Sequence, residues 1–174
     1  MISKLKFFFF SFFLLFIMSI SAKESIIIND SWKFYKSDQP GFFQMDFNDI
    51  SWENILLPHT WNALDGQDGG SNYYRGIGCY RKHITISRNY EGKVIYLKFG
   101  AANSAATVYL NGQLLGTHTG GYSAFMFDIT DKVLFGRENV IAVQVDNSSS
   151  VLCPPLSADF TFYGGLTRNV ELMV

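Results

Sequence analysis

Polar and apolar residues alternate with the two-residue period of β-strands along most of the chain beyond residue 22. No segment there sustains a helical period. In one stretch Ile141, Val143 and Val145 alternate with Val140, Ala142 and Gln144, so that one face would be fully apolar. The predicted strands are Tyr80–Ser87, Lys93–Phe99, Ala106–Leu110, Gln113–His118, Tyr122–Ile129, Asn139–Val145 and Thr167–Val174.

Turn residues separate these runs. Asn111-Gly112 predicts a type I′ hairpin between the third and fourth strands, because both residues tolerate a positive φ. Glu91-Gly92 and Gly136–Asn139 mark further turns, and Trp32 and Trp52 lie near strand starts, where we expect them to pack at a sandwich edge. Short, regularly spaced strands with glycine-rich turns predict an all-β fold, a β-sandwich of jelly-roll type.

The first 22 residues have a different pattern. Lys4 and Lys6 precede an apolar run over Phe7–Ile20, which is followed by small residues ending at Ala22. This three-part pattern predicts a secretory signal peptide over residues 1–22, cleaved near Ala22, and therefore export to the periplasm or the medium. A membrane anchor is the competing interpretation, but about 14 residues fall short of the roughly 20 that span a bilayer. The mature domain would cover residues 23–174, with no membrane contact after cleavage.

Length and charge narrow the functional classes. The chain has 174 residues, enough for one domain with its own core. Its formal net charge of -1 gives no electrostatic basis for binding nucleic acid or an anionic membrane. Aromatic residues are abundant, but those of Tyr122–Phe127 alternate as strand residues do, which favours a role in the core.

The sequence contains two cysteines, Cys79 and Cys153, and export would permit a disulfide between them. A single candidate pair leaves this open. The three histidines, His59, His83 and His118, lack the spacing of metal ligands. We therefore predict no transition-metal site.

The acidic residues do not form an evident catalytic pair. The chain has five glutamates, which fall at the mature terminus, in turns or along strands, where solvated surface roles are expected: Glu24, Glu53, Glu91, Glu138 and Glu171. Asp65 and Asp68 are better candidates, yet their glycine-rich context is typical of a turn or a domain contact. The chain also lacks a G-x-S-x-G elbow and a phosphate-binding glycine loop. No complete active site is predicted.

Two long segments without a strand pattern interrupt the sandwich, Leu57–Tyr80 and Asn147–Arg168. Long loops in a compact domain tend to be functional or to pack on something else. Asn147-Ser-Ser also matches the short N-x-S glycosylation pattern, which would place it in a surface loop. The two segments suggest a face that meets a sugar, a partner domain, or both.

Several motifs in these segments carry a resemblance to family 2 glycoside hydrolases that spans residues 23–174. They are Leu57–Asn62 (LPHTWN), Tyr73–Lys82 (YYRGIGCYRK), Val108–Gly112 (VYLNG), Gly116–Phe125, Phe127–Thr130 and Asp159–Arg168 (DFTFYGGLTR). The part that they resemble is the N-terminal sugar-binding domain, a jelly roll of the galactose-binding type. β-Galactosidases are the most similar members and β-glucuronidases the next.

The resemblance implies how such a domain works. In the family, an immunoglobulin-like domain and a (β/α)8 barrel follow, and the barrel carries both catalytic glutamates for hydrolysis of β-galactosides or β-glucuronides. Asn62 and Asp159 match family residues that reach the sugar, and in some members the aspartate helps to hold a monovalent cation. Carboxylate and amide groups suit sugar hydroxyls. Tyr163 and Arg168 are interpreted as packing or interface residues. No catalytic residue, metal ligand or cofactor is expected in this chain itself.

Two other functional classes stay open from the sequence. The chain could be a self-standing secreted carbohydrate-binding module, which would carry its own exposed aromatic platform. It could also be a secreted structural or adhesion sandwich, which would leave both long loops unexplained. The specific glycoside and the oligomeric state are not encoded in any motif.

Overall fold

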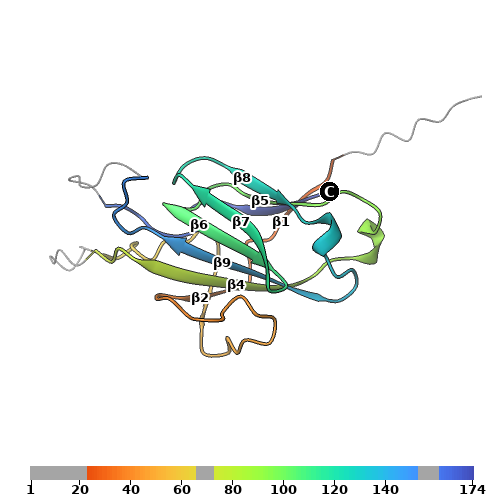
Figure 1. Cartoon of the computed structure of the whole chain (residues 1–174), viewed down its shortest axis with the longest axis horizontal. Helices are drawn as coiled ribbons and strands as arrows, with labels where there is room; N and C mark the ends of the chain where they lie inside the picture. Colours follow the sequence, from red (N-terminus) through yellow and green to blue (C-terminus); the bar gives the residue numbers. More distant parts are fainter. Residues whose placement is uncertain (1–22, 66–72, 153–160) are drawn as a thin grey trace, which may run out of the picture.

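The structure, a computed structural model, describes residues 23–65, 73–152 and 161–174. Within them the chain forms ten strands and two short 3-10 helices, arranged as two layers (Figure 1). In chain order the elements are β1 (Ser25–Ile27), β2 (Trp32–Tyr35), β3 (Glu53–Ile55), β4 (Ile77–Thr85), η1 (Arg88–Tyr90), β5 (Tyr96–Phe99), β6 (Ala105–Leu110), β7 (Gln113–Thr119), β8 (Phe125–Asp128), η2 (Thr130–Lys132), β9 (Glu138–Asp146) and β10 (Val170–Met173).

The strands pair antiparallel in two sheets. One sheet has the order β1-β10-β5-β8 and the other β3-β2-β4-β9-β6-β7. The predicted all-β sandwich is therefore confirmed. The hairpin is confirmed as well, because Asn111 and Gly112 join β6 to β7 with φ values of 52° and 83°.

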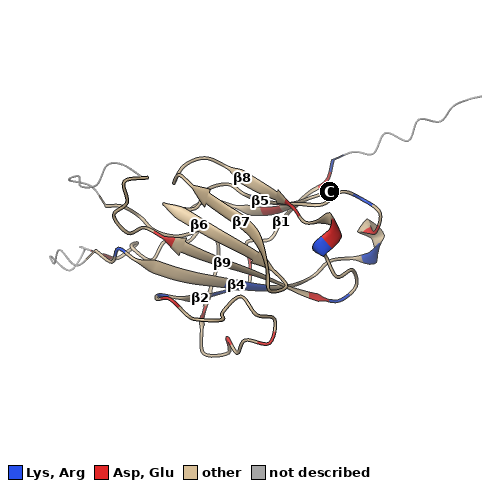
Figure 2. Ribbon diagram, viewed as in Figure 1, with Lys and Arg blue, Asp and Glu red and all other residues tan. Residues whose placement is uncertain are grey.

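The core lies between the two sheets. Alternate residues of β6 and β9 point inward with Tyr80 of β4, and they meet Leu97 and Phe99 of β5 from the opposite sheet. Trp32, expected at a sandwich edge, is fully buried in this core. Figure 2 shows the central strands largely in tan and most charged residues in loops and at strand ends. The strands thus supply the packing and leave most of the charge to the loops.

A second apolar cluster covers the outer face of the larger sheet. Phe42 and Trp52, from the segment between β2 and β3, pack on Cys79 of β4 and Ala142 of β9. Arg81 of β4 lies under the same segment with no solvent exposure and donates to Asp49 and to backbone carbonyls of the segment. Both faces of β4 and β9 are consequently buried, which explains the unbroken apolar run Val140–Val143 in β9.

Several sequence expectations need correction. The three N-terminal strands β1, β2 and β3 were not predicted, and β1 and β3 have only three residues each. Glu138, expected in a turn, begins β9. Asn147, expected in a surface loop, is fully buried, so its N-x-S pattern does not present a glycosylation acceptor.

The Cys79 side chain is a buried free thiol, and burial raises its pKa to about 12. Cys153 lies outside the described residues. Since the thiolate is the reactive form, we expect Cys79 of the native chain to resist iodoacetamide at about pH 8 and to react after unfolding. Mass spectrometry of the peptides, with and without denaturant, measures this for each cysteine. Alkylation of Cys79 in the native chain, or a peptide crosslinked through Cys79, would contradict the buried-thiol assignment.

Candidate functional site

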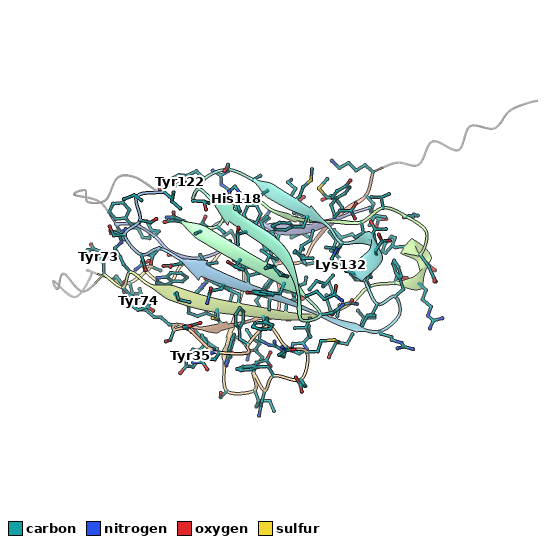
Figure 3. The ribbon with its side chains drawn as sticks, in the orientation of Figure 1. Tyr35, Tyr73, Tyr74, His118, Tyr122 and Lys132 are labelled. Carbon is teal, nitrogen blue, oxygen red and sulfur yellow. The ribbon has the colours of Figure 1, made fainter. Side chains whose placement is uncertain are left out.

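The register of the larger sheet brings several strand ends to one end of the sandwich. Asp146, the last residue of β9, pairs with both Ile77, which begins β4, and Ala105, which begins β6. The segments 59–65, 73–76 and 147–152 lie at this same end of the sandwich. In Figure 3, Tyr73 and Tyr74 mark this end, and Lys132 lies toward the opposite end. The bases of both long segments therefore meet in one place.

Asn62 joins these bases from the first segment. Its side chain is 1% exposed. The amide nitrogen donates to the Asp65 carboxylate (2.6 Å) and to the carbonyl of Tyr74 (2.9 Å), and the amide oxygen accepts from the backbone N–H of Gly164 (2.7 Å). One side chain thus connects stretches up to 102 positions apart in the sequence.

Asn147 makes the complementary set of bonds from the second segment. Its amide oxygen accepts from the backbone N–H of Gly76 (2.8 Å), and its amide nitrogen donates to the carbonyl of Phe162 (2.7 Å) and to the Asn62 amide oxygen (3.3 Å). We call Asn62 and Asn147 the asparagine pair. Because buried polar groups are costly unless bonded, this pair fixes the local backbone of both segments.

Three charged residues, Asp65, Lys36 and Arg75, complete the arrangement. The Asp65 carboxylate accepts from the backbone N–H of Tyr74 (3.0 Å), and Lys36 lies 4.0 Å from its other oxygen. Burial alone would raise the pKa of Asp65, but the hydrogen bonds from Tyr74 and Asn62 and the charge of Lys36 lower it overall. Arg75 donates to the carbonyl of Asn147 (3.0 Å) and lies over the Phe162 ring. These bonds hold the bases of the two segments in a fixed position, and they keep the Asp65 carboxylate ionised.

The residues predicted from sequence fall in different places. Asn62 is at the centre of the cluster, where its side chain is committed to internal bonds, and its contact with substrate stays a prediction. Asp159 and Asp68 lie outside the described residues. The Tyr163 side chain is 49% exposed, while its carbonyl accepts from Asn103 (2.6 Å), and Arg168 is exposed. Sequence reasoning missed Asn147, whose one signal was its position directly after a strand.

The described residues include no group of three or more His, Cys, Asp or Glu side chains that could hold a metal ion. Among the same residues, no helix has the length and apolar character needed to cross a membrane.

The fold and the asparagine pair define a class, a β-sandwich domain in which the bases of two long segments are joined at one end. The comparisons make the class specific. Residues 18–174 match the model of the family "Glycosyl hydrolases family 2, sugar binding domain". A β-glucuronidase of Bacteroides fragilis is 41% identical over 95% of this chain and 23% of its own length. A β-galactosidase of Thermoanaerobacter pseudethanolicus is 34% identical over 87% of this chain and 21% of its own length.

Solved structures agree with these relatives. The crystal structure of a Bacteroides uniformis β-glucuronidase superposes with a TM-score of 0.82 at 42% identity, covering 87% of this chain and 18% of that one. The chain therefore belongs to the sugar-binding domains of glycoside hydrolase family 2. It spans about a fifth of the length of the relatives that it matches.

Proposed function

We propose that this chain is the sugar-binding part of an exported family 2 glycosidase that hydrolyses β-galactosides or β-glucuronides. In this proposal an immunoglobulin-like domain and a (β/α)8 barrel belong to the same enzyme, and the barrel supplies the catalytic carboxylates. The two long loops of the sandwich complete the substrate pocket. The domain binds and orients the sugar, which raises the rate by positioning rather than by bond breaking.

The observation that carries the proposal is the asparagine pair in a chain of this family. A domain that only spaced other domains would have no need to join two loop bases with buried side chains, since buried amides cost free energy unless every bond is made. Two loop bases held in a fixed relation are suited to presenting polar groups to one ligand. One relative is a β-glucuronidase and another a β-galactosidase, which supports these two glycoside classes as the substrates.

Within this proposal Asp159 is the direct sugar contact, as an ionised carboxylate that accepts from hydroxyls, and a monovalent cation beside it is part of the same proposal. Asn62 contributes to sugar binding by holding its loop in place. Any direct contact with the sugar would use the same side-chain amide. The export signal over residues 1–22 and the jelly-roll type of the sandwich also belong to the proposal; strand neighbours distant in the sequence, such as β10 and β5, support the latter.

The first test is the size of the native polypeptide. Sequencing the coding region beyond the codon for Val174, or weighing the protein secreted by the native cell, is expected to reveal a chain several times longer. Translation that ends at Val174 in the native cell would overturn the glycosidase proposal and favour a self-standing module.

The second test is Asp159→Ala in the full-length enzyme. Loss of a charged hydrogen-bond partner of the sugar is expected to cost about 1.5–3 kcal/mol, or roughly a 10- to 150-fold fall in kcat/KM. Asp131→Ala, which removes an exposed carboxylate from η2, is the matched control and should leave kcat/KM unchanged. Kinetics within about threefold of wild type for Asp159→Ala would remove this residue from the site.

A further inference from the structure

A cavity of about 650 Å³ opens beside the asparagine pair, between β2 and the segment 59–65. Its wall includes the aromatic residues Phe34, Tyr35 and Trp61, and its rim carries Lys36, Glu53 and Asp65. Tyr35 is 40% exposed, so that part of its ring is free to meet a ligand. An aromatic wall with charged groups around it is the usual make-up of a small-molecule site.

His59 contributes a hydrogen-bond donor to this cavity. Its Nδ1 lies 2.9 Å from the hydroxyl of Tyr80, which is fully buried. The buried Tyr80 O–H must itself donate, and His59 Nδ1 is the acceptor beside it.

The tautomer of His59 follows from this contact. Burial lowers the pKa of His59 to about 4, so the ring is neutral at physiological pH. With Nδ1 accepting from Tyr80, the single ring hydrogen must lie on Nε2. In the part of the chain that the structure describes, Nε2 has no hydrogen-bond partner. His59 is one of the lining residues, so the cavity combines a neutral imidazole with the Lys36 ammonium and two carboxylates.

We propose that this cavity is a binding site for a neutral hexopyranoside, on residues that this chain alone supplies. A sugar hydroxyl both donates and accepts, so that it matches the donors His59 Nε2–H and Lys36 as well as the acceptors Glu53 and Asp65. Two carboxylates against one ammonium disfavour a uronate, since a like charge at close range costs free energy. The family's sugar-binding description selects carbohydrate over other small polar ligands. The site does not depend on Asp159 or on a catalytic domain.

The test is a titration of the chain with methyl β-D-galactopyranoside and methyl β-D-glucopyranoside, followed by amide-resolved NMR. Binding at about millimolar concentration is expected, with shifts confined to Tyr35, Glu53 and residues 59–65. Glu53→Gln and Lys36→Met, both at exposed positions, should each weaken binding about tenfold or more. Glu91→Gln, a matched change in the turn after η1, should leave the affinity unchanged.

Three results would overturn the proposal. They are no shifts up to about 100 mM sugar, shifts that map away from the cavity, or equal or tighter binding of methyl β-D-glucuronide. A wild-type affinity in Glu53→Gln would also exclude the site. None of these results bears on Asp159→Ala or on the native chain length, so failure here and failure of the glycosidase proposal can be told apart.

Discussion

Replacing Arg81 with methionine is expected to lower the free energy of unfolding by about 3–5 kcal/mol, the largest loss we expect from a single substitution. The guanidinium has no solvent exposure and binds the Asp49 carboxylate at 2.7 Å and the carbonyl of Gln44 at 2.9 Å. Methionine fills similar space but leaves Asp49 with His83 as its remaining partner and leaves buried carbonyls unpaired. Urea unfolding, followed by tryptophan fluorescence, measures the change.

Two further variants separate the ion pair from general damage. Arg137→Met alters an exposed arginine and should change the unfolding free energy by less than about 0.5 kcal/mol. The double variant Arg81→Met, Asp49→Leu removes both charges and should recover part of the loss, since a buried pair replaced by apolar groups is often neutral. A loss below about 1 kcal/mol in Arg81→Met alone would show that the covering segment does not depend on this residue.

Asn147→Ala is expected to lower the free energy of unfolding by about 3 kcal/mol. It should also loosen the bases of both long segments at once. The change leaves the Gly76 N–H and the Phe162 carbonyl without their partners in a buried place. It also removes a neighbour of Asn62, whose own bonds reach Gly164. Hydrogen exchange should therefore accelerate at the Gly76 and Gly164 amides together, while the Asn111 hairpin at the far end of β6 stays unchanged.

Asn48→Ala provides the matched control. Asn48 is exposed and accepts one bond from the Ile50 N–H, so its loss should cost less than about 1 kcal/mol and leave both amides protected. Faster exchange at Gly76 with an unchanged rate at Gly164 in Asn147→Ala would mean that the two segments are held independently. Unchanged rates at both would remove Asn147 from the cluster's framework.

The sequence predicted the strands whose periodicity is long enough to read. β4 and β9 each have nine residues, and the hairpin between β6 and β7 has an unambiguous turn. β1 and β3 have three residues each, too few for a two-residue period to stand out from chance. Their pairing comes from tertiary contacts, which local pattern does not contain.

The candidate site was predictable in outline only. Two long segments and a set of family motifs pointed to one end of the sandwich, and the register of β9 with β4 and β6 does bring their bases together. The role of Asn147 could not be read, because a buried asparagine and an exposed one look alike in sequence. The donor on His59 was equally hidden, since it depends on Tyr80, 21 positions away.

The segment that covers the larger sheet is held chiefly through its main chain. Arg81 donates to the carbonyls of Phe42, Gln44 and Phe47, which every residue type possesses, and Asp49 provides the one carboxylate. Exposed side chains of the segment, such as Met45 and Ile50, take no part in these bonds with Arg81. Substitutions on the outward face of the segment should therefore be tolerated while Arg81, Asp49 and the inward aromatic residues keep its path, which makes the segment a suitable place for grafting a new epitope.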